Sequence, residues 1–134
     1  MATELLVGDR LTEDMIAAGG HVVQALDRLN VIVKGAFWFL LPDQKVWRLI
    51  ISSPEVRISG PKAVYRKVTA ALKRIPLGSR GVDIKDITVV SDRDPLVQLI
   101  GSLIRTGAGI AGIRMSKNVI NGRLIDDMYV YRMT

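Results

Sequence analysis

Apolar and aromatic side chains are most concentrated in residues 31–52, where their alternation predicts a β-hairpin. The strands are expected at 31–33 with 36–41 and at 46–51, and a Pro-Asp pair at 42–43 favours a turn between them. If Leu41 faces Val46, both faces of this hairpin are largely apolar, with Trp38 on one and Phe37 on the other. Such a hairpin belongs in the middle of a sheet that is covered on both sides.

Three other segments have apolar residues at helical spacing. The first follows a capping Thr12 and continues to residue 29, with acidic residues in its first turn. The second begins at Pro61 and ends before Pro76, and the third begins at Pro95 behind a capping Asp94 and runs to the region of Gly107. The helices should pack on the sheet through these apolar stripes.

The remaining strands are expected at 55–58, as a short edge strand, at 87–90, and in a C-terminal hairpin that turns at Asn121 and Gly122. In that hairpin one face should hold Val119 with Leu124, Met115 with Met128 and Ile113 with Val130, and also the pair Lys117 and Asp126. A charged pair in apolar surroundings either stabilises the register or marks a site. The element order predicts one α+β domain over residues 1–134, with a mainly antiparallel sheet of about five strands and three helices packed on it.

Composition excludes several kinds of site. The 134 residues include no cysteine and a single histidine, His21, so we expect no disulfide, thiolate or histidine-rich metal centre, and no cofactor. His21 is either solvated or takes part in binding or proton transfer. Hydrophobic residues make up 49% of the chain, a high share that favours a homo-oligomer. The N-terminus has no signal-peptide pattern and 95–113 is a poor membrane span, which favours a cytoplasmic protein without membrane contact.

The net charge of +6 is concentrated in residues 61–82, which contain no acid. This segment predicts a basic helical surface over 62–80, formed by Lys62, Arg66, Lys67, Lys73, Arg74 and Arg80. Such a surface could neutralise several phosphates of a nucleic acid, bind an acidic protein, or be only a solvated face. Tyr65 lies at its edge and could stack on a base or pack against the core.

Gly107, Gly109 and Gly112 match a G-x-G-x-x-G pattern, but the pattern follows a helix and precedes a strand, the reverse of a dinucleotide site. With Arg105 and Arg114 the loop could still bind an isolated phosphate through its backbone amides.

A second pattern, Pro42-Asp43 followed by Asp83-Ile84-Lys85, resembles the carboxylate and lysine pieces of a restriction-nuclease-like magnesium site. The intervening basic helix and the turn at 42–43 count against this alternative.

These patterns favour a non-enzymatic binding or assembly module, homo-oligomeric, whose basic helix contacts an anionic partner such as nucleic acid. The alternative is a small phosphate-handling enzyme or ligand-binding protein that uses the 107–112 loop with Arg105, Arg114 and the pair Lys117 and Asp126. A purely structural homodimer is the third possibility.

Overall fold

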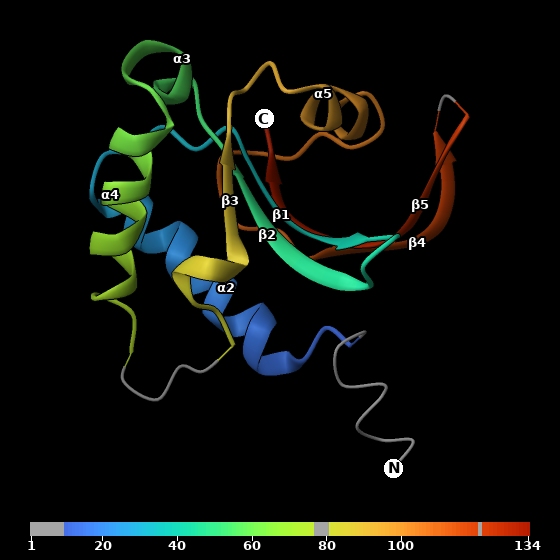
Figure 1. The fold of residues 1–134 in the computed structure, drawn as a ribbon, viewed down its shortest axis with the longest axis horizontal. Coiled ribbons are helices and arrows are strands. Elements are labelled where there is room, and N and C mark those ends of the chain that lie inside the picture. The colour runs from blue at the N-terminus through green and yellow to red at the C-terminus, as the bar shows by residue number, and fades with distance from the viewer. Residues whose placement is uncertain (1–9, 77–80, 121) are drawn as a thin grey trace.

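The computed structural model describes residues 10–76, 81–120 and 122–134, and it has an α+β fold, as predicted (Figure 1). Its five-stranded sheet has the order β3-β2-β1-β5-β4 and is antiparallel except for the pair β2 and β3. The strands are β1 (Gly35–Leu41), β2 (Val46–Ser52), β3 (Ile87–Val90), β4 (Ile113–Ile120) and β5 (Arg123–Met133). The helices are α2 (Glu13–Arg28), α3 (Glu55–Ser59), α4 (Pro61–Leu72), the 3₁₀ turn η1 (Ile84–Asp86) and α5 (Pro95–Gly101).

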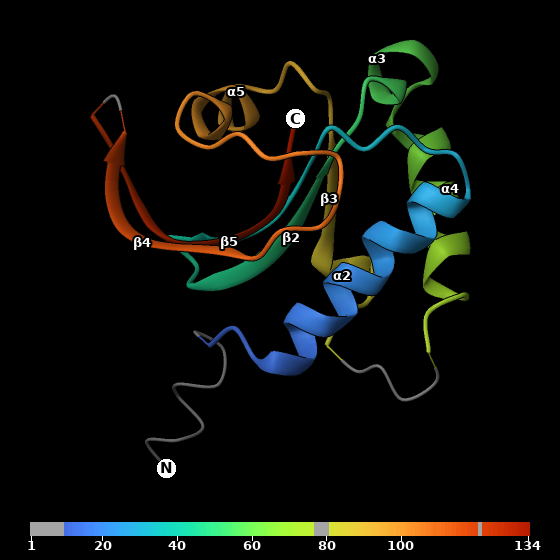
Figure 2. The ribbon, with the colours of Figure 1, turned by 180° about the vertical axis from the view of Figure 1, so that it is seen from behind.

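The sheet is strongly curled, and helices cover both of its faces (Figures 1 and 2). On the outer side, α2 and α4 bury a core that includes Trp38, Leu49 and Val68. On the inner side, α5 lies in the hollow of the curl and packs on a second core that includes Phe37 and Met128. Both faces of β1 and β2 are therefore covered, which explains why their sequence is largely apolar.

The central hairpin has the predicted register. Leu41 pairs with Val46, Trp38 with Leu49 and Phe37 with Ile50. The first strand, however, begins at Gly35, so the predicted strand at 31–33 is wrong. The prediction at 87–90 is confirmed in both bounds.

The close contact between α2 and the sheet depends on Gly19. Trp38 Nε1 donates a hydrogen bond to Tyr131 Oη (3.0 Å), and that hydroxyl donates to the carbonyl of Ile16 in α2 (2.5 Å). A Cβ atom on Gly19 would lie 2.4 Å from Tyr131 Oη and 2.7 Å from Trp38 Nε1. Burial raises the pKa of the Tyr131 hydroxyl above its ordinary value, so this group remains a neutral donor.

The predicted edge strand at 55–58 is wrong, because these residues form the short helix α3. Ser53 Oγ accepts a hydrogen bond from the backbone N–H of Glu55 (3.1 Å), and the backbone of Pro54 is already helical. Local capping therefore outweighs the strand propensity of the sequence. The other helices are shorter than predicted: α4 ends at Leu72 and α5 ends at Gly101.

The C-terminal hairpin keeps its predicted register but not its predicted faces. Ile113 pairs with Val130 and Val119 with Leu124, whereas Asn121 of the predicted turn lies outside the described residues. Lys117 has a φ of 51°, a left-handed conformation that interrupts the alternation of the strand. Beyond this residue Val119 and Leu124 are 68% and 58% exposed, and their neighbours Ile120 and Ile125 enter the inner core instead.

Candidate nucleic-acid interface

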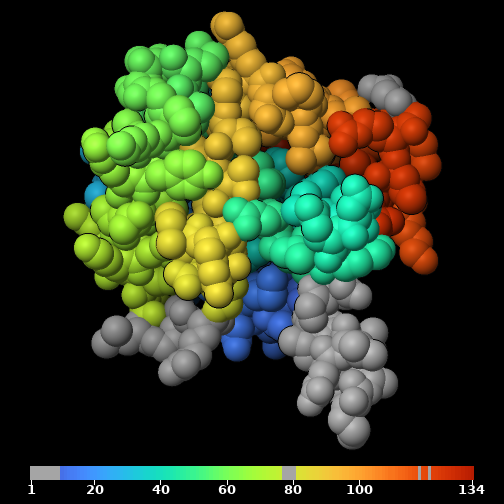
Figure 3. Space-filling model, in the orientation of Figure 1, coloured from blue at the N-terminus to red at the C-terminus, as the bar shows by residue number. Residues whose placement is uncertain are grey.

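The outer side of α4 carries most of the predicted basic surface. The apolar side chains of Val64, Val68 and Ala71 are buried, and helical periodicity places Lys62, Arg66 and Lys73 together on the opposite side. Lys73 continues the helical backbone as the residue that caps the C-terminus of α4. Figure 3 shows α4 at the surface of the molecule, beside the segment that leads into β3.

Four of the predicted cations are exposed on α4 or directly after it, and we name them the α4 basic face: Lys62, Arg66, Lys73 and Arg74. Helical periodicity places the first three on one stripe and Arg74 to one side of it. All four are exposed, and none has an ion-pair partner among the residues that the structure describes. Arg80, the sixth predicted cation, lies outside the described residues.

Lys67 differs from the α4 basic face because its charge is balanced. Its Nζ lies 2.7 Å from Oε1 of Glu55, in α3. The hydrogen bond from Lys67 lowers the pKa of the Glu55 carboxyl below its ordinary value, and the N–H of Ile32 adds to this effect. Arg57 is balanced in the same way by Asp92 (2.8 Å). Among the cations of α4 and of the two residues after it, the unbalanced ones are therefore those of the α4 basic face.

Tyr65 does not extend this surface, because it faces the sheet. Its hydroxyl accepts a hydrogen bond from the backbone N–H of Val89 (3.0 Å), on the outer edge of β3. This bond satisfies an edge-strand donor and attaches α4 to the sheet. Of the two roles that the sequence left open for Tyr65, packing is the one that the structure supports.

The glycine loop has a structural role along β5. The N–H of Thr106 donates to the carbonyl of Met133 (2.9 Å), and the N–H of Ala111 donates to that of Tyr131 (2.7 Å). The carbonyl of Gly109 accepts a hydrogen bond from Nε of Arg132 (3.2 Å). A Cβ atom on Gly112 would lie 2.4 Å from the hydroxyl oxygen of Tyr129, so any other residue there would displace the Tyr129 ring. A small cavity of about 210 Å³ lies against the loop, lined by Thr106, Gly107, Gly109, Ile110 and Ala111.

The two arginines that flank the loop are not brought together at that cavity. Arg105 donates to the carbonyl of Thr134 (3.0 Å) and lines a different cavity. Arg114 forms two hydrogen bonds with Asp127 (2.7 and 2.6 Å), and its guanidinium lies 5.6 Å from the ring centroid of Trp47. The predicted phosphate site is therefore not assembled.

Lys117 and Asp126 do not form the predicted buried pair. Lys117 is exposed, and the left-handed backbone at this residue interrupts the pairing that would have placed it opposite Asp126. Asp126 instead lies 3.4 Å from Nζ of Lys45, in the turn of the central hairpin.

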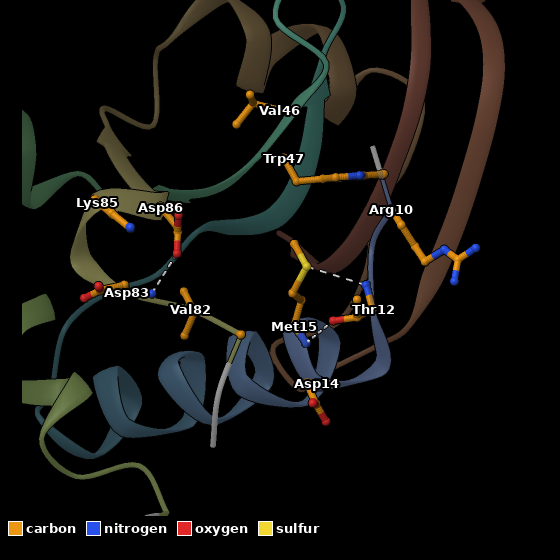
Figure 4. A pocket seen from close by; sticks show the side chains of 11 residues that line it. Arg10, Thr12, Asp14, Met15, Val46, Trp47, Val82, Asp83, Lys85 and Asp86 are labelled. Atoms are coloured by element: carbon orange, nitrogen blue, oxygen red, sulfur yellow. Dashed lines mark hydrogen bonds between the residues drawn. The ribbon is translucent and has the colours of Figure 1, made fainter. Parts of the chain in front are cut away.

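A cavity of about 680 Å³ opens between the start of α2, the start of β2 and residues 81–86 (Figure 4). Two of its acidic residues have structural roles: Asp83 accepts from the N–H of Ile84, and Asp86 accepts from the N–H of Asp83. Asp43 of the nuclease pattern lies in the hairpin turn and does not line this cavity. Nowhere in residues 10–76, 81–120 and 122–134 do three or more His, Cys, Asp or Glu side chains gather as a metal site would require.

His21 lines a shallow cavity of about 270 Å³ between α2 and the glycine loop, together with Gln24 and Tyr129. The side chain is half-buried. This placement leaves open both readings of His21, solvation and binding.

The sequence interpretation missed the ion pair between Arg132 and Asp27. Arg132 is only 5% exposed, and its two terminal nitrogens donate to the two carboxylate oxygens of Asp27 (2.9 and 2.8 Å). The pair joins the last turn of α2 to β5. An arginine in an otherwise apolar strand end is the one signal that could have indicated it.

The chain matches no known family model, no curated protein and no solved structure. Among the described helices, even α2 with its 16 residues lacks the length and apolar character of a bilayer span.

Proposed function

We propose that the protein is a non-enzymatic binding module whose α4 basic face contacts a polyanion, with nucleic acid as the partner class. The observation that carries the proposal is a cluster of exposed cations in a segment without acidic residues. Lys62, Arg66, Lys73 and Arg74 lie on α4 or directly after it, and none of them is paired with a carboxylate among the described residues. Residues 61–82 contain no acid. Clustered cations of this kind give affinity for phosphates through the release of counterions.

The rigid support of α4 favours this role further. Its buried stripe packs in the outer core with α2, and the hydrogen bond between Tyr65 and Val89 holds it at the edge of the sheet. The basic side chains are therefore displayed from a fixed backbone, so that binding orders side chains only.

The test is fluorescence anisotropy with a labelled 16-base-pair DNA at several salt concentrations. Four phosphate contacts predict a slope of log K against log salt of about −3.6, which corresponds to about a 50-fold loss of affinity between 50 and 150 mM salt. The variant Lys62→Glu/Arg66→Glu/Lys73→Glu should abolish measurable binding, because attraction becomes repulsion.

The matched control is Arg10→Glu/Lys117→Glu/Arg123→Glu, which reverses three exposed cations outside α4, one before α2 and two in β4 and β5. Both variants lower the net charge from +6 to zero, because each substitution changes it by two units. The control should retain most of the affinity. Equal loss in the two variants would mean that only the total charge matters, and the α4 basic face would then not be an interface.

The homo-oligomer stays a prediction. Val119 and Leu124 supply exposed apolar surface on the β4 and β5 hairpin that a second copy could cover. Size-exclusion chromatography with light scattering measures the state directly, and a monomer at micromolar concentration would contradict it.

A further inference from the structure

The exposure of the aromatic residues indicates which class of nucleic acid the α4 basic face can bind. Proteins that hold single strands usually stack successive bases on exposed aromatic side chains. The chain has seven aromatic residues, and all of them lie within the described part of the structure. Five are buried, and the other two, Tyr65 and Tyr129, are half-buried. No stacking platform is exposed on this protein.

The exposed stripe of α4 carries no amide or carboxylate side chain that could read base edges. Thr69 lies between the cations on this stripe, and its hydroxyl already donates to the carbonyl of Tyr65 (3.0 Å). The rest of the stripe consists of Lys62, Arg66 and Lys73, whose long side chains suit phosphate contacts. When these cations contact phosphates, binding is independent of sequence.

The spacing of the cations fits the two backbones of a duplex. Lys62 and Arg66 lie in the first half of α4, and Lys73 and Arg74 follow its last turn. Seven residues separate Arg66 from Lys73, about 10 Å along the helix axis at 1.5 Å per residue. The major groove of B-form DNA is about 12 Å wide, so the two groups can each meet one of the two phosphate ridges.

We infer that the α4 basic face binds double-stranded DNA by bridging the two phosphate backbones across the major groove, without reading the sequence. This inference rests on the proposed function and specifies its ligand. A duplex also presents more charge per unit length than a single strand, one negative charge per about 1.7 Å of axis.

The test compares four labelled probes at 50 mM salt: a 16-base-pair DNA duplex, a DNA duplex of shuffled sequence, one strand of the first duplex alone, and an RNA duplex of the same sequence. We expect the DNA duplex to bind at least tenfold more tightly than the single strand and a shuffled duplex to bind within twofold. The RNA duplex should bind more weakly, because its major groove is deep and narrow. A single strand or an RNA duplex that binds as tightly as the DNA duplex would overturn the inference.

Two paired variants test the bridging geometry. Lys62→Gln/Arg66→Gln removes one group of cations and Lys73→Gln/Arg74→Gln removes the other, at exposed positions where the fold, checked by circular dichroism, should persist. Each variant should reduce the magnitude of the salt slope for the DNA duplex by about two, and the two variants should lose similar amounts of affinity. If only one pair matters, the bridging geometry is wrong. If wild-type protein binds none of the probes, the proposed function itself fails, whereas equal binding to all of them overturns only the choice of a DNA duplex.

Discussion

Replacing Gly19 by alanine should destabilise the fold, although alanine is the better helix former. The glycine lies inside α2, where its missing side chain leaves room for the hydroxyl of Tyr131 and the indole of Trp38. A methyl group there would lie 2.4 Å from one and 2.7 Å from the other, well inside van der Waals contact. Both rings are held by the sheet and are almost fully buried, so neither can swing away.

The expected change in the free energy of unfolding is the sum of one stabilising and two destabilising contributions. Alanine gains up to about 1 kcal/mol over glycine in a helix interior. Overpacking of a filled core costs about 1–3 kcal/mol. Moving Tyr131 would also break its hydrogen bonds with Trp38 and Ile16, and an unpaired buried donor costs about 1–3 kcal/mol. We therefore expect Gly19→Ala to lower the free energy of unfolding by about 1–5 kcal/mol.

Gly20 provides the matched control, because it occupies the next position of the same helix. A Cβ atom there would have its nearest neighbour at 3.7 Å, on the Tyr131 ring, which is an ordinary contact. Gly20→Ala should therefore raise the free energy of unfolding by about 0.5–1 kcal/mol. Urea unfolding followed by tryptophan fluorescence measures both. A Gly19→Ala protein as stable as Gly20→Ala would refute the close packing of α2 on Tyr131.

Two further predictions concern stability. Ser52 and Ser53 are both fully buried, but the hydroxyl of Ser52 has no hydrogen-bond partner among the described residues. Ser52→Ala should therefore raise the free energy of unfolding by up to about 1 kcal/mol. Ser53→Ala should lower it by about 1 kcal/mol, because the hydrogen bond that caps α3 is lost. Urea titrations that show the same sign for both would contradict this assignment. The hydrogen bond from Arg57 lowers the pKa of the Asp92 carboxyl below its ordinary value of 3.8. This pair therefore stabilises the fold above that pH, and its contribution is lost as the pH falls below it. The urea midpoint should consequently fall less steeply between pH 5 and pH 2.5 in Asp92→Asn than in the wild type.

The sequence predicted the elements whose pattern is local and regular. The register of β1 and β2 follows from a tight turn between two apolar runs, and the start of α5 follows from Asp94 and Pro95. The basic surface was also predictable, because the buried stripe of α4 determines which residues face outward.

The predictions that were wrong depended on the conformation of the backbone or on contacts between elements. Residues 55–58 have strand-like composition but follow the capping Ser53, and the predicted faces of the last hairpin were lost at the left-handed Lys117. Likewise, no local pattern distinguishes Lys67, whose partner Glu55 lies on another helix, from the four cations left unbalanced. Pairing across elements depends on the fold, so the composition of the candidate site could be refined only from the structure.

The hydrogen bond between Tyr65 and Val89 adds a directional contact to the apolar packing of α4. A helix that contacts a core through apolar side chains alone can in principle roll about its axis, and one residue of rotation corresponds to about 100°. Such a roll would turn Arg66 from the solvent toward the sheet. Together with the buried stripe of Val64, Val68 and Ala71, the tyrosine fastens the inner side of α4 to the sheet edge. The orientation of any bound partner relative to the whole molecule therefore depends on side chains that the partner never touches.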